Sequence, residues 1–391
     1  MAKISSGSLL MKRPICIGII GGGQLGKMIT QEAKRMSFRV IILDPSDQCP
    51  ASSVSDEQIV ANFDDENAIR KLATKSDVLT YEIELANSTA LKDLQSKKYP
   101  VYPSPETLAI IQNKHRQKSF LKGNNIAVPR FDLVDSEDHL RQLCASYGFP
   151  NILKACQDSY DGRGNFLIKS KDKIHEAFAY FAGKECMLEK FVPYLKEISI
   201  IVARNSSGQI ESFPVGENIH NKGILDTTIV PARISEKLNT RAKKMAEKTM
   251  QAIKGAGIFG IEMFVMHDGN VLINEIAPRP HNSGHYSIEA CSISQFEQHL
   301  RAVLNLPLSK PELLCPAVMV NILGSANHSG PYAIKGLKNL FSIQGVKLHI
   351  YGKIISNPRR KLGHITVTAN TVEQALSRAK RARKMIKLVV N

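Results

Sequence analysis

Short apolar runs alternate with amphipathic stretches along the N-terminal part of the chain. Such runs predict buried strands, and the stretches between them predict helices. The predicted strands are Ile15–Ile20, Val40–Leu43 and Val78–Glu82, and the predicted helices are a segment ending near Arg35, Glu66–Lys75 and Ser88–Gln95. This β-α-β-α-β order is typical of a parallel, doubly wound sheet. Pro103 and Pro105 end the pattern, so we expect a first domain at residues 14–112, after a loose tail at residues 1–13.

The remainder of the chain mixes strands and helices without a repeat. The central part predicts strands at Phe149–Ala155, Cys186–Val192 and Glu197–Arg204, an extended stretch at 210–220, and helices at Glu106–Lys122, Glu236–Lys254 and Ile288–Leu304. The last part predicts short strands at Val318–Leu323, Lys347–Tyr351 and His364–Thr368 and a final helix. We therefore expect an α/β and α+β protein with a central domain at 113–310 and a small α+β domain at 311–391.

A hairpin in the central part carries two acids. Two apolar runs, 261–266 and 271–276, flank Asp268-Gly269, which is a strong signal for a two-residue turn. Such a turn would place opposite each other Met266 and Val271, Phe264 and Ile273, and Glu262 and Glu275. Carboxylates that face each other across a strand pair repel. A divalent cation would relieve this repulsion, and with Asn274 alongside, the hard oxygen ligands favour Mg²⁺ carrying nucleotide phosphates. A solvated edge hairpin with unpaired acids is the alternative interpretation.

The segment after the hairpin is a charged loop that glycine and proline prevent from becoming a helix. It contains Arg279, His281, Asn282 and His285, and it follows directly on a strand that ends in acids. This combination indicates an active site. A zinc site of the H-E-x-x-H type is not indicated, because no acid lies between the two histidines and Ser283-Gly284 interrupts any helix.

A glycine-rich loop joins the first predicted strand to the first helix. Gly21, Gly23 and Gly26 satisfy G-x-G-x-x-G, and Asp44 follows about twenty residues later. Backbone amides at such a helix start can hold a phosphate, whether of a dinucleotide, a mononucleotide or a sugar phosphate. Glu82 ends its strand at the sheet edge where ligands bind. A nicotinamide-dependent oxidoreductase is one alternative, but it leaves the facing acids of the hairpin unexplained.

Two further features suggest phosphate binding. Lys154 interrupts an apolar strand, and residues 159–165 (SYDGRGN) form a glycine-rich loop suited to closing over phosphates. Lys114 and Lys118 lie on the helix that precedes them. We interpret Glu84 as a surface acid.

Charge and cysteine content restrict the partners and the compartment. The formal charge of +16 indicates anionic partners. The densest basic run, Arg378–Lys387, has no interleaved aromatic residues for stacking bases, so we interpret it as a solvated helix face and expect no nucleic-acid partner. No apolar run approaches the roughly 20 residues of a membrane span. Seven scattered cysteines without C-x-x-C spacing indicate a reducing, cytoplasmic location and buried core positions.

Taken in order, the strand lysine, the glycine-rich loop and the Glu/Asn-Glu hairpin resemble the ATP-grasp ligases. The closer resemblance is to the N5-carboxyaminoimidazole ribonucleotide synthetases, and it covers residues 14–391. The matching segments are GGGQLGKM (21–28), TYEIE (80–84), YDGRGN (160–165), EKFV (189–192), NEIAPRPHNSGHY (274–286), YGK (351–353) and RRKLGH (359–364). One departure is Arg359, which stands where the family commonly has glycine. A sister ATP-grasp carboxylase or formyl transferase is a second alternative.

This resemblance implies a three-domain ATP-grasp fold and a ligase of purine biosynthesis. The reaction would join ATP, bicarbonate and 5-aminoimidazole ribonucleotide through carboxyphosphate, with Mg²⁺, or Mn²⁺ in its place. A homodimer and a separate downstream mutase are implied partners.

The resemblance also implies residue roles. ATP would be held by Lys114, Lys154, Ser159, Tyr160, Asp161, Gly162, Arg163, Gly164, Asn165, Glu189, Lys190, Phe191, Val192, Glu197, His220, Asn274 and Glu275. The ribonucleotide would be bound by Gln24, Glu82, Tyr160, Asp161, Asn282, Ser283, Lys353, Arg360 and Lys361. The metal ligands would be Glu262, Asn274 and Glu275, and the catalytic residues Asp161, Arg163, Arg279 and His281. The general base stays open among Asp161, Glu82 and His281.

Overall fold

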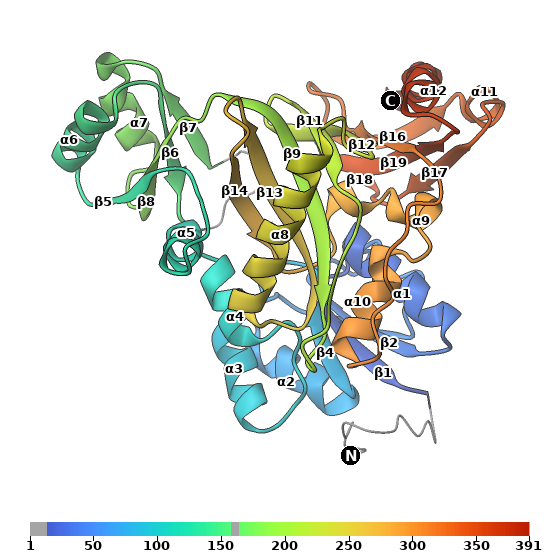
Figure 1. Cartoon of the computed structure of the whole chain (residues 1–391). Coiled ribbons are helices and arrows are strands. Elements are labelled where there is room, and N and C mark those ends of the chain that lie inside the picture. The colour runs from blue at the N-terminus through green and yellow to red at the C-terminus, as the bar shows by residue number, and fades with distance from the viewer. Residues whose placement is uncertain (1–13, 158–163, 391) are drawn as a thin grey trace.

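The computed structural model describes residues 14–157 and 164–390. The N-terminal part forms a four-stranded parallel sheet in the order β3-β2-β1-β4, at the bottom of Figure 1. Its elements are β1 (Cys16–Ile20), α1 (Gln24–Arg35), β2 (Arg39–Asp44), β3 (Glu57–Val60), α2 (Glu66–Lys75), β4 (Val78–Tyr81) and α3 (Ser88–Ser96). The predicted parallel sheet is confirmed. The sequence pattern missed β3, because this short edge strand buries only Ile59.

The first sheet is covered by helices on both faces. One face packs against α2 and α3, and the other against α1. Helix α10 (Gln295–Val303), from the central part of the chain, joins α1 through Phe296, Leu300 and Val303. The first sheet and the central part therefore share one apolar core.

A small antiparallel sheet projects at the upper left of Figure 1. Its order is β5-β8-β6-β7, and α6 and α7 cover it. The elements are β5 (Phe131–Val134), α6 (Glu137–Tyr147), β6 (Asn151–Ala155), β7 (Asn165–Ile168), η1 (Lys171–Lys173), α7 (Ile174–Tyr180) and β8 (Cys186–Lys190). This projecting sheet carries Lys154 and Glu189.

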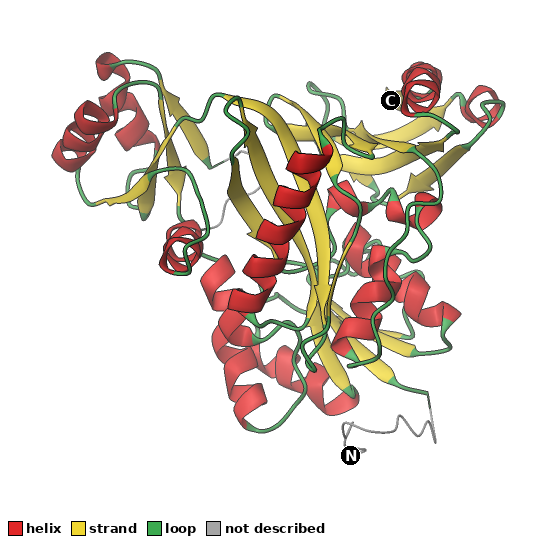
Figure 2. Ribbon diagram, in the orientation of Figure 1, coloured by secondary structure: helices red, strands yellow, loops and turns green. Residues whose placement is uncertain are grey.

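A nine-stranded antiparallel sheet forms the centre of the molecule (Figure 2). Its main path is β14-β13-β9-β11-β12-β15-β19-β17, with β10 paired to β9. The strands are β9 (Tyr194–Arg204), β10 (Ile210–Ser212), β11 (Gly216–Asn221), β12 (Ile224–Val230), β13 (Gly257–Met266), β14 (Val271–Ala277), β15 (Ala317–Leu323), β17 (Val346–Ile350) and β19 (Lys361–Thr368). Helix α8 (Glu236–Ile253) packs on it through Ala242, Ala246 and Met250. The sheet continues past residue 310 into the C-terminal part.

The C-terminal part adds a three-stranded sheet, β18-β16-β20. Its elements are β16 (Gly330–Lys335), α11 (Leu337–Phe341), β18 (Ile355–Ser356), α12 (Val372–Met385) and β20 (Lys387–Val390). The predicted basic helix is therefore real, but it ends at Met385 and a strand follows it. Arg383 on α12 binds both carboxylate oxygens of Asp226 on β12, so this arginine does not belong to a purely solvated face.

Two predicted helices are each divided in two. Residues 106–122 form α4 (Pro105–Ile111) and α5 (Lys114–Gly123), because Asn113 caps the second helix by accepting the N–H of Arg116. Residues 288–304 form α9 (Ser287–Ala290) and α10, which Ser294 caps. Periodicity continues across both breaks, whereas the caps restart the backbone.

The seven cysteines are unpaired, and six of them are buried, as predicted for core residues. Within the described ranges, no helix has the length and apolar character that crossing a membrane requires.

Candidate active site

Strands β13 and β14 place Glu262 opposite Glu275, as the sequence predicts. The other predicted pairs are wrong by one residue, because the turn has three residues, 267–269, and not two. The N–H of Met266 donates to the backbone oxygen of Asn270 across this turn, at 2.8 Å. Val265 therefore faces Val271, and Phe264 faces Leu272. A bulge at Asn274 then restores the register one residue later. The longer turn and the bulge shift the register in opposite directions, so Glu262 and Glu275 still face each other.

Lys114, at the start of α5, binds one of these acids. Its Nζ lies 3.0 Å from Oε2 of Glu275. Partial desolvation by its surroundings would raise the pKa of Glu275, but the adjacent lysine more than offsets this effect and holds the pKa below its ordinary value. The pKa of Glu262 is raised, because burial and the charge of Glu275 oppose its ionisation, although His220 opposes the rise. Glu275 is therefore held in its ionised form, whereas ionisation of Glu262 would be favoured by an added positive charge.

A second lysine cluster surrounds Glu189 on β8. Lys154 on β6 lies 2.6 Å from Oε1 of Glu189, and Lys118 on α5 lies 2.7 Å from Oε2. The two lysines outweigh the burial of Glu189 and lower its pKa to about 2. Lys118 also donates to the backbone oxygen of Asn274 at 3.1 Å, which connects the projecting sheet to the hairpin. Lys118 is absent from the roles predicted from the sequence, although its position one helical turn after Lys114 places both on one face.

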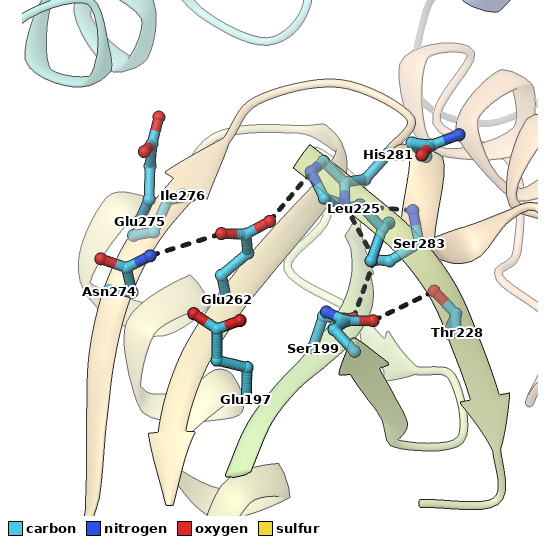
Figure 3. A network of polar contacts seen from close by, with 12 residues as sticks. Glu197, Ser199, Leu225, Thr228, Glu262, Asn274, Glu275, Ile276, His281 and Ser283 are labelled. Atoms are coloured by element: carbon cyan, nitrogen blue, oxygen red, sulfur yellow. Dashed lines mark hydrogen bonds and ion pairs between the residues drawn. The ribbon is translucent and has the colours of Figure 1, made fainter. Parts of the chain in front are cut away.

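His281 lies beside Glu262, near the carboxylate oxygen that Asn274 does not contact (Figure 3). Its Nε2 lies 3.5 Å from Oε1 of Glu262, and its Nδ1 lies 2.8 Å from Oγ of Ser283. Asn274 donates to the other oxygen of Glu262 at 3.4 Å. Burial lowers the pKa of His281 well below its ordinary value, and the charges of Arg279 and Lys361 act in the same direction. His281 is therefore neutral at physiological pH.

Arg279 binds Glu84, an acid that was predicted from the sequence to lie on the surface. Its Nε lies 2.8 Å from Oε1 of Glu84, which follows the end of β4. Both side chains are half-buried, so the interpretation of Glu84 as a surface acid is wrong. The TYEIE segment contained this signal, because it places Glu84 two residues after Glu82 at the same sheet edge.

Glu197 on β9 lies opposite Asn218 on β11, and its carboxylate forms an ion pair with His220 farther along β11. Burial alone would lower the pKa of His220, but Glu197 raises it above its ordinary value. Together with neighbouring side chains they line a hollow beside the acids. The lining residues are Glu197, Ile198, Asn218, His220, Glu262, Met263, Phe264 and Asn274.

Other predicted nucleotide contacts lie at the edge of the projecting sheet. Phe191 and Val192 are half-buried in the segment after β8. The side chain of Lys190 turns away to the backbone oxygens of Gly148 and Pro150, at 3.0 and 3.3 Å. Gly164 accepts the N–H of Ala155, and Asn165 begins β7. Ser159, Tyr160, Asp161, Gly162 and Arg163 lie outside the described residues.

The glycine loop does not offer its amides to a phosphate. The N–H of Gly22 donates to Asp44 at 2.8 Å, and the N–H of Gly23 donates to Glu82 at 2.5 Å. The expectation that these amides hold a phosphate is therefore wrong, because two carboxylates already occupy them. The pKa of Glu82 is raised to about 7, because the effect of burial is larger than the opposing effect of the hydrogen bond from the Gly23 N–H. Gln24 begins α1 beside this acid.

The predicted ribonucleotide residues divide into separate groups. Lys353 lies 5.7 Å from the ring centre of Tyr351, and its charge lowers the pKa of Glu82. Arg360 donates to the backbone oxygen of Ile355 at 2.9 Å. Lys361 instead acts on the pKa values of Glu262 and His281, so it lies toward the acids.

Asn282 and Ser283 are buried and bind other side chains. Asn282 exchanges two hydrogen bonds with Asn321 of β15, at 2.6 and 3.0 Å. Asn321 lies in an apolar strand, and no local signal in the sequence identified it. Arg359, the departure from the family pattern, has φ of +60°, so it adopts a conformation that glycine reaches more easily.

Models of known protein families match three consecutive segments. They are described as a ribonucleotide synthetase preATP-grasp domain (residues 14–112), an ATP-grasp domain (residues 119–296) and a phosphoribosylaminoimidazole carboxylase C-terminal domain (residues 317–378). Together with the lysines and acids around the hairpin, these matches define an ATP-grasp ligase.

Comparison with individual proteins narrows the class. The N5-carboxyaminoimidazole ribonucleotide synthase of Bacillus subtilis is 42% identical over 350 residues, which cover 90% of this chain and 90% of that protein. The N5-carboxyaminoimidazole ribonucleotide synthetase of Thermotoga maritima has a solved structure that is 48% identical, with a TM-score of 0.89 over 96% of this chain and 100% of that chain. This chain belongs to the N5-carboxyaminoimidazole ribonucleotide synthase family.

Two further relatives differ in length or in bound ligands. The phosphoribosylaminoimidazole carboxylase of Saccharomyces cerevisiae is 41% identical over 93% of this chain, which spans only 65% of that longer protein. A synthase from Aspergillus clavatus, solved in complex with ADP and 5-aminoimidazole ribonucleotide, is 33% identical, with a TM-score of 0.87 over 95% of this chain and 98% of that chain.

Proposed function

We propose that this chain carboxylates 5-aminoimidazole ribonucleotide with bicarbonate at the expense of ATP, giving N5-carboxyaminoimidazole ribonucleotide, ADP and phosphate in purine biosynthesis. One observation carries the proposal: lysines for phosphates, facing acids and a neutral histidine meet around one hairpin in a chain of this family. The Aspergillus clavatus relative, which has ADP and 5-aminoimidazole ribonucleotide bound, supports the same substrates.

The chemistry takes two steps. A bicarbonate oxygen attacks the γ-phosphorus of ATP, the bond to the β-phosphate oxygen breaks, and ADP leaves carboxyphosphate behind. The ribonucleotide amine then attacks the carbon of carboxyphosphate, or of carbon dioxide released from it; phosphate leaves and the nitrogen loses a proton. Both steps concentrate negative charge, and fixed positive and hydrogen-bond-donating groups stabilise such transition states.

Lys114 and Lys154 are placed to receive the nucleotide phosphates. Each is bound to a carboxylate, Glu275 or Glu189, so each is held in place before the nucleotide arrives. Lys118 stays beside Glu189 when Lys154 turns to a phosphate, because its own contact with that acid is separate. We assign the adenine to the 189–192 segment and the ribose to Glu197, with His220 beside it. The loop 159–165 would close over the phosphates.

Mg²⁺ is the proposed metal. In the part of the chain that the structure describes, no cluster of three His, Cys, Asp or Glu side chains could hold an ion by itself. The donors that are present, Glu262, Glu275 and Asn274, offer hard oxygens, and Mg²⁺ commonly completes its ligands with water and substrate phosphates. The raised pKa of Glu262 fits a site that gains from a cation. When bound, Mg²⁺ or Mn²⁺ would neutralise phosphate charge.

Arg279 and His281 are proposed to bind bicarbonate and carboxyphosphate, with Asp161 and Arg163 from the loop. Arg279 is oriented by Glu84, and His281 lies beside Glu262. The ribonucleotide would bind between Gln24 and Glu82 on one side and Lys353 and Arg360 on the other, with Tyr160, Asp161 and Asn282 completing the set. Ser283 and Lys361 are assigned instead to the surroundings of His281 and Glu262. Family membership and the action of the Lys353 charge on Glu82 support this assignment.

We further propose a homodimer, a cytoplasmic location and a separate mutase that moves the carboxylate of the product from nitrogen to carbon. Seven unpaired cysteines suit a reducing compartment. The domain limits that we propose are residues 14–112, 113–310 and 311–391.

ADP release tests the proposed function. The purified chain receives ATP, Mg²⁺ and bicarbonate, with or without 5-aminoimidazole ribonucleotide. We expect strong, bicarbonate-dependent stimulation by the ribonucleotide. ADP release that ignores the ribonucleotide would refute the proposed acceptor, and a folded protein that releases no ADP would refute the proposed function.

A further inference from the structure

Two buried serines form a hydrogen-bonded chain that ends on His281. The hydroxyl of Ser199, on β9, donates to Oγ of Ser283 at 2.8 Å. Oγ of Ser283 lies 2.8 Å from Nδ1 of His281 (Figure 3). Ser199 is 3% exposed and Ser283 is fully buried, so water does not compete for these contacts. These two serine hydroxyls therefore contact the Nδ1 side of the imidazole, whereas Glu262 lies on its Nε2 side.

The backbone adds a second donor to the same nitrogen. His281 caps the short helix η2 (Asn282–Gly284) by accepting the N–H of Ser283 at Nδ1, at 3.4 Å. A backbone N–H can only donate, so Nδ1 must carry a lone pair. The Ser283 hydroxyl accepts from Ser199, which leaves its own hydrogen for Nδ1. Two donors of different kinds thus make Nδ1 an acceptor.

The position of the remaining hydrogen follows from this arrangement. A neutral imidazole carries one N–H, and with Nδ1 acting as an acceptor that hydrogen is on Nε2. Nε2 faces the acids, 3.5 Å from Oε1 of Glu262. The ring packs against Gly260 on β13, where an added Cβ would come within 2.6 Å of the ring carbon Cγ. The glycine therefore gives the imidazole the space that this orientation requires.

We propose that Ser199 and Ser283 are positioning residues that lock His281 in its Nε2–H tautomer. His281 then presents a hydrogen-bond donor, and not a base, to the oxygens of bicarbonate and carboxyphosphate. The identity of the bound substrate rests on the proposed function, whereas the tautomer rests on the hydrogen bonds of Ser199 and Ser283. It removes His281 from the candidates for the general base and leaves Glu82 and Asp161. A preorganised donor beside developing negative charge stabilises the transition state.

Nitrogen NMR of the ligand-free protein tests the tautomer directly. The chain is labelled with ¹⁵N-histidine, and the signals of His281 are assigned among the eleven histidines by their loss in His281→Gln. We expect an unprotonated Nδ1 and a protonated Nε2. Ser283→Ala and Ser199→Ala should give a mixture of the two tautomers. Protonated Nδ1 in the unaltered protein, or an unchanged tautomer in Ser283→Ala, would overturn the inference.

Kinetics test what the tautomer does. In His281→Gln the side-chain amide nitrogen would lie near the position of Nε2, whereas the amide in His281→Asn is too short to reach it. His281→Gln should therefore keep at least about tenfold more turnover than His281→Asn, as expected for one hydrogen bond to a charged group. Equal loss in the two variants would overturn the donor role. In Ser283→Ala, kcat/KM for bicarbonate should fall about tenfold while the KM for ATP stays unchanged.

Two controls separate tautomer from structure. Thr249→Val removes a buried hydroxyl on α8 that bonds only within its helix, and it should leave kinetics and histidine signals unchanged. Ser287→Ala removes two hydrogen bonds at the start of α9, to Gly284 and from Gln295, and neither involves the His281 side chain. A tautomer mixture in Ser287→Ala would mean that loop structure, and not the serine chain, sets the proton, and would overturn the inference. The NMR result holds whether or not ADP is released, so failure of the proposed function remains distinguishable.

Discussion

Lys118 donates to Glu189 between two separate parts of the structure. Nζ of Lys118, on α5, lies 2.7 Å from Oε2 of Glu189 on the projecting sheet, and both side chains are almost fully buried. Glu189 also holds Lys154 at 2.6 Å, so one acid keeps two cations in place before any nucleotide binds. An acid with one permanent and one exchangeable partner lets Lys154 move to a phosphate without leaving an unpaired buried charge.

Replacing Lys118 should therefore impair ATP binding more than folding. In Lys118→Met, Glu189 retains only Lys154, so this lysine is held away from the nucleotide and the KM for ATP should rise about tenfold or more. The free energy of unfolding should fall by about 1–3 kcal/mol, because a buried partner is lost while another remains. Steady-state kinetics and urea denaturation measure the two effects. Lys92→Met, at an exposed lysine of α3, is the matched control, and an unchanged KM for ATP in Lys118→Met would contradict the prediction.

Glu275→Gln should abolish activity without unfolding the protein. The substitution removes a proposed metal ligand and the acid that faces Lys114, and we expect turnover to fall at least about a hundredfold. Because Glu275 is 47% exposed, the loss of its ion pair should change the free energy of unfolding by less than about 1 kcal/mol. ADP release at increasing Mg²⁺ and chemical denaturation check both parts. If Glu275→Gln still turns over at saturating Mg²⁺, Glu275 is not the metal ligand that we propose.

Glu82 should make stability fall as pH rises toward neutrality. Its folded pKa of about 7 lies above the ordinary value of 4.5, so between these values the folded state binds more protons than the unfolded state. Its contribution to stability is complete below pH 4.5 and is lost as pH rises to about 7. The loss relative to Glu82→Gln should be of the order of 3 kcal/mol. Denaturation of both proteins across this range gives the difference, and parallel pH curves would contradict the raised pKa.

Lys353 and Lys361 should affect different substrates. The charge of Lys353 acts on Glu82, whereas the charge of Lys361 acts on Glu262 and His281. Lys353→Met should therefore weaken binding of 5-aminoimidazole ribonucleotide and spare ATP. Lys361→Met should change the KM for bicarbonate or ATP more than that for the ribonucleotide. Calorimetry with each ligand decides the matter, and the reverse pattern would refute the division.

Arg359→Gly should leave the protein as stable or more stable. The left-handed conformation at Arg359 costs about 1–2 kcal/mol for a residue with a Cβ, and the greater freedom of glycine in the unfolded chain offsets about half of that gain. We expect an increase of up to about 1 kcal/mol in the free energy of unfolding. Thermal denaturation measures it, and an unchanged affinity for the ribonucleotide checks that the neighbouring Arg360 is undisturbed. A clear loss of stability would show that the arginine side chain makes a stabilising contact.

Local sequence patterns were enough to predict the parallel N-terminal sheet, the acid-bearing hairpin and the family. These features depend on local periodicity, turn residues and contiguous motifs, which a linear chain displays directly. The opposition of Glu262 and Glu275 was predicted correctly although two details of the hairpin were wrong, because the longer turn and the bulge at Asn274 shift the register in opposite directions.

Which charged groups contact each other depends on how the elements pack, and the sequence did not predict it. The contacts of Lys118 with Glu189 and of Arg279 with Glu84 join residues from different elements, and no period or spacing encodes them. The same holds for the glycine loop, whose amides are occupied by Asp44 and Glu82 rather than left open for a phosphate. The tautomer of His281 is a further case, because it is set by Ser199 on a strand that the sequence places far away. Packing brings these groups within hydrogen-bonding distance, and burial then sets their protonation states.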